Sequence, residues 1–300
     1  MPELPEVEVV KLFLEDKLLH QTITDIEILS PKSFIGDKSK VIGQKIIKFS
    51  RLGKQLSIHL SNGLILLVHL KMTGQLILSP LSLKGVPEGR GILMGHPTKN
   101  ALTNLPNNSA RIIFYFSPPS SRGVSKGRGV LFFNDQRKFG WIKLLTNAKL
   151  VEAQENLGHD IFDSRFTPQY LYSQLQRSSR AVKLVLLDQH FFAGIGNIYA
   201  NDALFLSGIH PSTPANKITR TQSPQIHHHL IDIMQQSVLA GGSTMKDNKY
   251  VRPDGSFGSN QFFFRVYQRA GEPCLTCHAP IKKISLGGRG TFFCPKCQSI

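Results

Sequence analysis

The four cysteines constrain the fold of this chain more than any other feature of its sequence. They occur as Cys274-Leu275-Thr276-Cys277 and Cys294-Pro295-Lys296-Cys297, with sixteen residues between the two pairs. Two CxxC pairs at this spacing are typical of a zinc ion bound by four thiolates in a tetrahedral, structural site. Disulfides are the alternative, although they are rare in a reducing compartment. The pattern predicts a short stapled β-hairpin and excludes a chain-wide disulfide framework.

The charge of the chain indicates a polyanionic partner. The 300 residues include thirty-six Lys and Arg and twenty Asp and Glu, which gives a formal net charge of +16. Such an excess favours nucleic acid as the partner, and a merely basic protein is the alternative. No apolar run is long enough to cross a membrane, and the acidic, proline-containing start does not resemble a signal peptide. We therefore expect a soluble intracellular protein that binds nucleic acid.

The first eight residues, Met1-Pro2-Glu3-Leu4-Pro5-Glu6-Val7-Glu8, combine a proline with several carboxylates. Removal of Met1 exposes the secondary amine of Pro2, and the reference pKa of an α-amino group, about 8, leaves a usable lone pair. Such an amine can attack an electrophilic carbon and form an iminium, with Glu3 and Glu6 nearby as proton donor and orienting group. A structural role is the alternative, because Pro5 and Glu6 also suit the first turn of a helix.

The spacing of apolar residues changes along the chain and predicts an α+β multidomain protein. Alternation and turn residues, such as Ser61-Asn62-Gly63, predict strands in the first half. The predicted strands cover residues 22–29, 45–49, 55–60, 64–69, 111–116, 130–133 and 141–145. The predicted helices of the second half cover residues 167–176, 181–188, 197–206 and 223–239. Residues 79–109 and 117–129 show no period and are predicted to be long surface loops.

Two further motifs each allow two interpretations. Gly194-Ile195-Gly196-Asn197-Ile198-Tyr199-Ala200 joins two helical stretches, and Asn197 can cap the second helix beside a phosphate site. The alternative is an ordinary corner between helices. Asn134-Asp135-Gln136-Arg137-Lys138-Phe139-Gly140 places two cations beside an aromatic ring, which suits a wedge in a base stack. The alternative is a surface turn with a core phenylalanine.

Together these motifs resemble one family, the bacterial formamidopyrimidine-DNA glycosylases, which are base-excision repair enzymes with DNA lyase activity. The resemblance rests on residues 2–8, 69–74, 135–140 and 194–200 and on the four cysteines, which follow the family's order. It implies one structural Zn²⁺, damaged double-stranded DNA as the partner, no membrane, a monomer, and a cytoplasmic, nucleoid-associated location in a bacterium.

The resemblance also implies three domains. Residues 1–148 form an N-terminal β-sandwich with a flanking helix, which is the catalytic domain. Residues 149–260 form a helix–two-turn–helix bundle that binds DNA. Residues 261–300 form the four-cysteine zinc finger, with its β-hairpin. A loop over residues 250–261 is expected to cover the lesion.

Carried over residue by residue, the resemblance assigns the catalytic centre. Pro2 becomes the nucleophile, Glu3 the proton donor at the deoxyribose, and Glu6 a residue that positions the N-terminus. Lys54 and Arg289 match residues that bind the phosphate of the damaged nucleotide. These groups need an extrahelical nucleotide, because the sugar carbon is out of reach inside the duplex.

The resemblance assigns further residues to DNA binding. They are His69, Met72, Arg137, Lys138, Phe139, Lys183 and Asn197. Among them, Met72, Arg137 and Phe139 match the residues that fill the gap left by the extruded nucleotide. Lys183 and Asn197 match contacts to phosphate or to the lesion.

Substrate choice is predicted from smaller features. Leu4 and Val7 match the formamidopyrimidine class, whereas the sister class usually has glycine at the first of these positions. Arg137 can offer two donors to the cytosine left opposite an extruded guanine. The resemblance thus implies removal of oxidised purines, 8-oxoguanine and formamidopyrimidines, by Schiff-base chemistry with β,δ-elimination, and faster removal opposite cytosine than opposite adenine.

Two departures from the family pattern bear on that substrate range. Lys138 stands where a second arginine is common, and a point charge replaces a bidentate fork there. Asp202 stands where a glutamate is common. The alternative functions are an endonuclease VIII-like glycosylase that acts on oxidised pyrimidines, and a zinc-ribbon DNA-binding protein that is catalytically silent.

Overall fold

The computed structural model describes residues 2–79, 92–95, 105–117, 129–243 and 259–299. Met1 and most residues of the three predicted loops, 79–109, 117–129 and 250–261, lie outside the described residues. No helix among the described residues combines the length and the apolar character that crossing a membrane requires.

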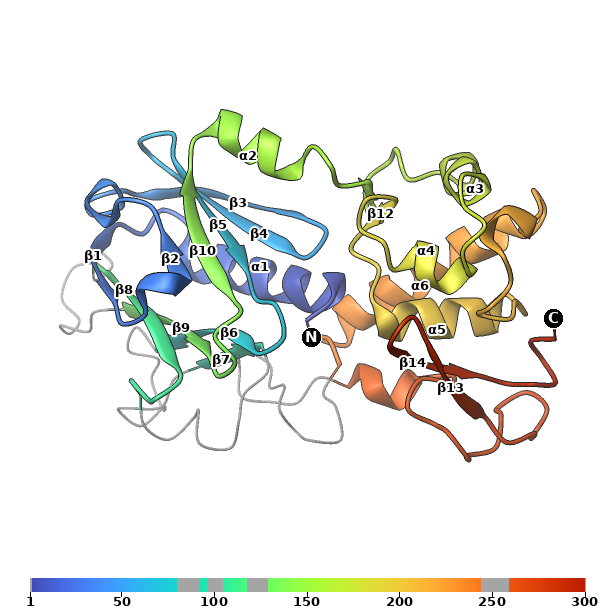
Figure 1. The fold of residues 1–300 in the computed structure, drawn as a ribbon. Helices are drawn as coiled ribbons and strands as arrows, with labels where there is room; N and C mark the ends of the chain where they lie inside the picture. Colours follow the sequence, from blue (N-terminus) through green and yellow to red (C-terminus); the bar gives the residue numbers. More distant parts are fainter. Residues whose placement is uncertain (1, 80–91, 96–104, 118–128, 244–258, 300) are drawn as a thin grey trace. The chain divides into compact units, whose positions relative to one another are not determined.

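The chain separates into two compact units. One consists of Met1–Glu155 with Ala240–Ser259, and the other of Asn156–Leu239 with Asn260–Ile300. Of the described elements, ten of the fourteen strands lie in the first unit and four of the six α-helices lie in the second (Figure 1). The predicted change from strands in the first half to helices in the second half is therefore present in the structure.

The first unit is a sandwich of two sheets with α1 (Leu4–Leu18) beside them. One sheet has, in spatial order, β1 (Ile23–Ile28), β8 (Ala110–Phe116), β9 (Gly129–Asp135), β6 (Gly74–Ser79) and β7 (Ile92–Gly95). The other has β2 (Phe34–Ile35), β10 (Trp141–Leu145), β5 (Ile65–His69), β4 (Gln55–Leu60) and β3 (Ile46–Leu52). Only β2 and β10 pair in parallel among the described strands of these sheets.

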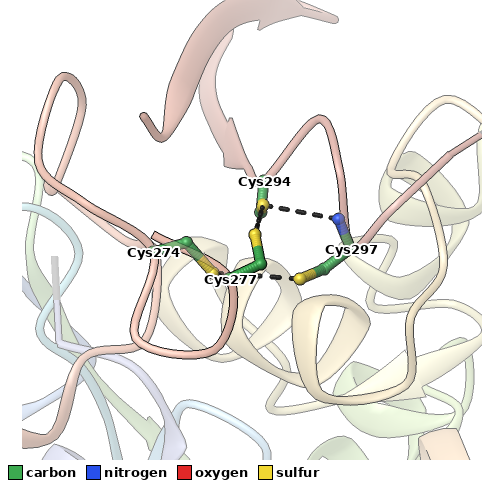
Figure 2. A group of neighbouring side chains, drawn as sticks. All are labelled: Cys274, Cys277, Cys294 and Cys297. Atoms are coloured by element: carbon green, nitrogen blue, oxygen red, sulfur yellow. Dashed lines mark hydrogen bonds between the residues drawn. The ribbon is translucent and has the colours of Figure 1, made fainter. Parts of the chain in front are cut away.

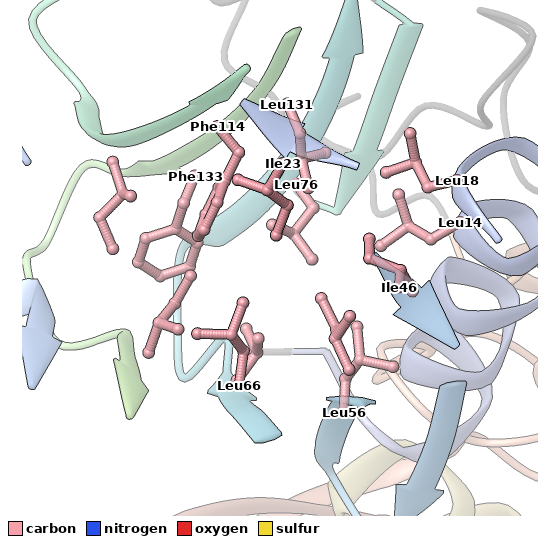
Figure 3. Packing of buried hydrophobic residues seen from close by; sticks show 14 of the residues in the cluster. Leu14, Leu18, Ile23, Ile46, Leu56, Leu66, Leu76, Phe114, Leu131 and Phe133 are labelled. Carbon is pink, nitrogen blue, oxygen red and sulfur yellow. The ribbon is translucent and has the colours of Figure 1, made fainter. Parts of the chain in front are cut away.

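The core of this unit lies between the sheets and under α1. Figure 3 shows side chains of both sheets pointing toward one another, with Leu14 and Leu18 of α1 at the same level. Phe133 of β9 is fully buried among them. Truncation of such a side chain to alanine costs about 3–5 kcal/mol of stability, so this layer holds the loops at the sandwich edge in place.

Helix α2 (Asn147–Gln154) and strand β7 were not predicted from the sequence. Leu150 of α2 packs on Ile65 and Leu67, which point away from the central core. Strand β5 is therefore buried on both faces, which explains its uninterrupted apolar run. Strand β7 lies within residues 79–109, so the prediction of an unstructured loop was wrong at Ile92–Gly95, where the chain pairs with β6.

The second unit is built around four α-helices of the described region. They are α3 (Pro168–Gln176), α4 (Val182–Leu186), α5 (Asn197–Leu206) and α6 (Ser223–Leu239). Thr167, at the predicted start of this helix, is the N-cap of α3, and its side chain accepts a hydrogen bond from Tyr170 N–H at 3.1 Å. The predicted cap of α5 was wrong: Gly196 is the N-cap, and Asn197 is already helical.

Shorter elements complete the two units. The 3-10 helices are η1 (Pro31–Ser33), η2 (Lys38–Lys40), η4 (Ala215–Lys217) and η5 (Asn260–Phe263). Strands β11 (His159–Asp160) and β12 (Phe192–Ala193) pair in parallel. The predicted C-terminal hairpin is present as β13 (Lys282–Leu286) and β14 (Arg289–Phe293), and Phe292 packs on Phe205 of α5 in one hydrophobic cluster.

Candidate functional site

The first residues of the chain are buried and fixed at the start of α1. Pro2 is buried, and the side chains of Glu3 and Glu6 are 4% and 2% exposed. Glu3 is the N-cap of the helix, and one oxygen of Glu6 accepts its N–H at 2.9 Å. The other oxygen of Glu6 accepts the N–H of Ser243 at 3.1 Å. Glu6 therefore holds the backbone beside Pro2, and its role in catalysis stays a prediction.

Lys54 lies in the turn between β3 and β4 and is buried. The preceding Arg51 reaches Glu8 of α1, with 2.6 Å between Nε and Oε2, and also donates to the Gly53 carbonyl at 2.9 Å. Burial raises the pKa of Glu8, but the hydrogen bonds and charges of Arg51 and Lys11 together outweigh burial and lower this pKa overall. This ion pair ties the helix of Pro2 to the turn of Lys54. This pair was not predicted from the sequence, although Glu8 belongs to the opening motif.

His69, at the end of β5, is neutral throughout the physiological range. Burial, followed by the positive charges of Lys71 and Lys54, lowers its pKa to about 3. Its Nδ1 accepts the N–H of Lys71 at 3.0 Å. The proton of the neutral ring is therefore assigned to Nε2, which makes this nitrogen a hydrogen-bond donor.

Two loops of the first unit present apolar side chains to solvent. We call residues 70–73 and 136–140 the wedge loops. Met72 is 41% exposed and Phe139 is 55% exposed, so the alternative of a core phenylalanine was wrong. The guanidinium of Arg137 lies 5.2 Å from the centre of the Phe139 ring. Lys138 is exposed, with a left-handed backbone. These features suit insertion into a base stack.

In the second unit, Lys183 and Asn197 both point to the C-terminal hairpin. Lys183 is fully buried, and its Nζ donates to the Gly290 carbonyl at 3.0 Å and to Thr291 Oγ1 at 2.7 Å. Asn197 Nδ2 donates to the same carbonyl at 3.1 Å. Direct contacts of these two side chains with DNA stay predictions. Their described bonds instead hold the strand that begins at the exposed Arg289.

Asp202, the other departure from the family pattern, is a buried anchor in the second unit. Its carboxylate accepts the N–H groups of Arg265, Val266 and Tyr267, each at 3.0 Å. Burial raises its pKa, although these three bonds act in the opposite direction. The shorter side chain of Asp202 thus fixes the backbone of residues 265–267, which precede the four cysteines.

The four cysteines gather at the base of the hairpin, as predicted (Figure 2). Their sulfur atoms lie within 4.8 Å of one another, and Cys277 Sγ and Cys294 Sγ are 3.4 Å apart. A tetrahedral zinc ion with bonds of about 2.3 Å separates its sulfur ligands by about 3.8 Å. The cysteines are free, and the backbone N–H groups of Thr276 and Cys297 point to sulfur atoms. The donor set therefore fits one structural zinc ion and leaves no open position for catalysis.

Comparison with known protein families covers most of the chain. Residues 1–142 match the formamidopyrimidine-DNA glycosylase N-terminal domain. Residues 157–249 match the H2TH domain of formamidopyrimidine-DNA glycosylase. Residues 271–300 match the zinc finger found in FPG and IleRS.

Individual relatives and structures agree with these matches. The formamidopyrimidine-DNA glycosylase of Chloroflexus aurantiacus is 36% identical and aligns over 99% of this chain and 98% of its own length. The relative from Ligilactobacillus salivarius is 34% identical over 100% of this chain and 99% of its own. The crystal structure of MutM (Fpg) from Thermus thermophilus has a TM-score of 0.81 at 31% identity, covering 99% and 98% of the two chains. A complex of Lactococcus lactis Fpg with DNA containing an abasic site has a TM-score of 0.81 at 29% identity, with full coverage of both.

Proposed function

The chain belongs to the formamidopyrimidine-DNA glycosylase family, and from this premise we propose that Pro2 and Glu3 carry its chemistry. The protein is a bifunctional base-excision repair enzyme, a glycosylase for oxidised purines with AP lyase activity. Among the structural neighbours is a complex of Lactococcus lactis Fpg with DNA containing Fapy-dG, an oxidised purine. Damaged duplex DNA is its substrate.

The chemistry begins at the amine that removal of Met1 creates. The Pro2 nitrogen uses its lone pair to attack C1′ of the damaged nucleotide, and the base leaves with the electrons of the glycosidic bond. Glu3 donates a proton at the deoxyribose as the sugar ring opens to an iminium. The iminium acidifies the neighbouring sugar carbon, so that β-elimination and then δ-elimination release the two phosphates.

One observation carries this assignment. The two oxygens of Glu6 accept the backbone N–H groups of Glu3 and Ser243, so the pair Pro2–Glu3 starts from a fixed backbone. Because both oxygens of Glu6 are engaged, we assign proton donation to Glu3, which adjoins Pro2. We propose that Lys54 in the first unit and Arg289 in the second each supply positive charge for a DNA phosphate.

Sodium borohydride trapping on a duplex with 8-oxoguanine tests the assignment. We expect the parent protein to form a covalent complex and Pro2→Gly and Glu3→Gln to lose most of the cleavage. Mass spectrometry of the parent must find Pro2 as the first residue. A Pro2→Gly variant that traps and cleaves as well as the parent would remove Pro2 from the mechanism, and retention of Met1 in the active protein would do the same.

We further propose a division of labour along the chain. Residues 1–148 supply the catalysis and the wedge, residues 149–260 the helical DNA-binding surface, and residues 261–300 the zinc finger. The matched family segments support these limits, although the hairpin belongs to the same compact unit as the helices. We place the enzyme in the bacterial cytoplasm, at the nucleoid, where its substrate lies.

For the DNA interface we propose the residues of both units that were predicted from the sequence. In the wedge loops, Met72 and Phe139 are more than a third exposed, and Arg137 lies beside the ring. Arginine there favours cytosine opposite the extruded base. Single-turnover rates on 8-oxoguanine opposite cytosine and opposite adenine measure this preference, and we expect the first to be faster.

A further inference from the structure

The wedge loops lie together because the sandwich places them so. One loop joins β5 to β6, and the other joins β9 to β10. Strands β5 and β10 are neighbours in one sheet, while β6 and β9 are neighbours in the other. Both loops therefore pass from one sheet to the other at the same end of the sandwich, where these neighbouring strands end or begin. This proximity comes from topology alone, and it does not by itself fix how the loop tips move.

Asp135, the last residue of β9, connects the two loops through its side chain. It is fully buried, and it pairs with Gly74 across the sheet. Its Oδ2 accepts the N–H of Gly140 at 2.6 Å, and its Oδ1 accepts the N–H of Arg137 at 3.1 Å. The same Oδ1 accepts the hydroxyl of Thr73, from the other loop, at 2.5 Å. One carboxylate thus binds both ends of one loop and the end of its neighbour.

Thr73 completes the connection in the opposite direction. Its Oγ1 accepts a hydrogen bond from the N–H of Arg137 at 3.0 Å, and its hydroxyl donates a hydrogen bond to Asp135. The hydroxyl is therefore donor and acceptor at once, and its acceptor Asp135 is 62 residues away in the chain. Hydrogen bonds to a charged partner are stronger than those between neutral groups.

The backbone around this junction has little freedom. Lys71 and Lys138, which precede Met72 and Phe139, both have left-handed conformations, with φ of 53° and 60°. A β-carbon at Gly140 would lie 2.8 Å from the Phe133 ring and 3.2 Å from the His69 carbonyl. The strand end is held as well, because buried Arg111 donates to the Asp135 carbonyl at 2.9 Å. Strained positions of this kind persist only where the surroundings hold them.

We propose that Asp135 and Thr73 are positioning residues that join the two wedge loops into one rigid unit, which enters the DNA stack as a whole. This inference rests on the proposed function, in which the loops fill the gap of an extruded nucleotide. Neither residue touches the sugar or the base. Asp135 and Thr73 instead restrict the loops that carry the exposed side chains. Two independent loops would lose conformational freedom when they insert into DNA. Two joined loops have already lost that freedom on folding, so insertion costs less.

The sharpest test is the isosteric change Thr73→Val, which removes both bonds of the hydroxyl and preserves the β-branched shape. Thr24→Val, at an exposed position of β1, is the matched control. Excision of 8-oxoguanine from a paired duplex is measured under single-turnover conditions. Extrusion is followed separately by the fluorescence of 2-aminopurine beside the lesion. Loss of the connection slows extrusion and excision by about fivefold, which corresponds to about 1 kcal/mol.

The same substitution is then made in a variant that lacks the Phe139 ring, which distinguishes a positioning role from general destabilisation of the protein. In a Phe139→Ala protein, Thr73→Val has less than about twofold further effect, because contacts that share one function are not additive. Asp135→Asn, which keeps the size of the side chain, follows the same pattern. Melting temperatures show whether each variant is folded. Equal losses in both backgrounds, or unchanged extrusion by folded Thr73→Val, would overturn the inference.

The proposed function can fail separately. If the parent protein extrudes the base but releases no lesion, Pro2 chemistry is wrong and the fluorescence still reports on the wedge loops. If Phe139→Ala extrudes the base as fast as the parent, the loops are not a wedge, and the coupling has no function to serve.

Discussion

The wedge loops and the zinc hairpin are two regions that present cations to solvent, and they are held by different means. The wedge loops depend on one buried carboxylate, Asp135, and a shared hydroxyl. The hairpin depends on four thiolates at its base and on buried donors of the helices, among them Lys183.

The difference extends to the backbone. Left-handed positions in the wedge loops are occupied by lysines, whereas the hairpin turn has Gly287 and Gly288 with φ of 56° and 72°. Glycine adopts this conformation without strain, and lysine does not. The hairpin is thus an unstrained turn that needs an external ion, while the wedge is a strained turn held by its own polar network. The two regions should respond to different perturbations.

Removal of zinc should have the largest effect. A structural zinc site contributes about 10–16 kcal/mol of apparent binding free energy, so Cys294→Ser or chelation should unfold the hairpin. DNA affinity should fall by about a hundredfold, which corresponds to about 2.7 kcal/mol. Hydrogen exchange should show lost protection at residues 282–293 and unchanged protection in the wedge loops. Equal loss in both regions would contradict the comparison.

Lys183→Met should have the next largest effect. The change keeps the apolar stem but leaves Thr291 Oγ1 without the donor that holds it at 2.7 Å. We expect a loss of about 2 kcal/mol in unfolding free energy and increased hydrogen exchange in β14. Lys217→Met, at an exposed position of the same unit, is the control. If exchange is unchanged while DNA binding weakens, Lys183 contacts DNA directly, as the family resemblance implied.

Acid should weaken the wedge side of the comparison through His69. Its folded pKa of about 3 lies below the ordinary 6.5, so the unfolded chain binds the extra proton between these values. Stability is therefore complete above pH 6.5 and falls as the pH decreases, by about 1.4 kcal/mol for each pH unit. Urea unfolding between pH 7 and about pH 5 measures this slope, with the exposed His228→Gln as control. His69→Gln should reduce this slope, and the slope that remains belongs to other groups, among them His59, His210 and His229, whose pKa values burial also lowers. An unchanged slope in this variant would contradict the prediction.

The salt dependence of DNA binding should show the smallest effect. Each phosphate contact contributes about −0.9 to the slope of log affinity against log salt concentration. Arg289→Ala should therefore reduce the magnitude of this slope by about one unit. Arg137→Ala should change it less, because its guanidinium lies over Phe139 and is assigned to a base. Equal changes for the two variants would show that both arginines bind phosphate.

Patterns that are local in sequence determined much of this protein. The spacing of the two CxxC pairs predicted the thiolate cluster, because four ligands on two short turns need no other part of the chain. Ser61-Asn62-Gly63 predicted a hairpin between β4 and β5, and Thr167 predicted the start of α3. In each case the deciding interactions occur within a few residues.

Other features were decided only by the tertiary structure. Asn197 has the sequence of a helix cap, yet its side chain donates to Gly290, which is distant in the chain. Strand β7 has no clear period and forms because β6 offers a free edge. Lysine is usually a surface residue, yet Lys183 is fully buried, because the hairpin provides hydrogen-bond acceptors for its ammonium group.

Asp135 shows the same limit at the candidate site. The motif that contains Asp135 predicted a turn with cations and an aromatic ring. No residue near Asp135 in the sequence indicated that Thr73 would be its hydrogen-bond partner. A buried carboxylate is costly unless its oxygens are bonded, and here the bonds come from both loops. Residue types and their local spacing therefore determined the family, the metal ligands and the candidate nucleophile. The packing of two sheets decided which of these residues hold one another in place, because side-chain partners across a sandwich are set by topology and register.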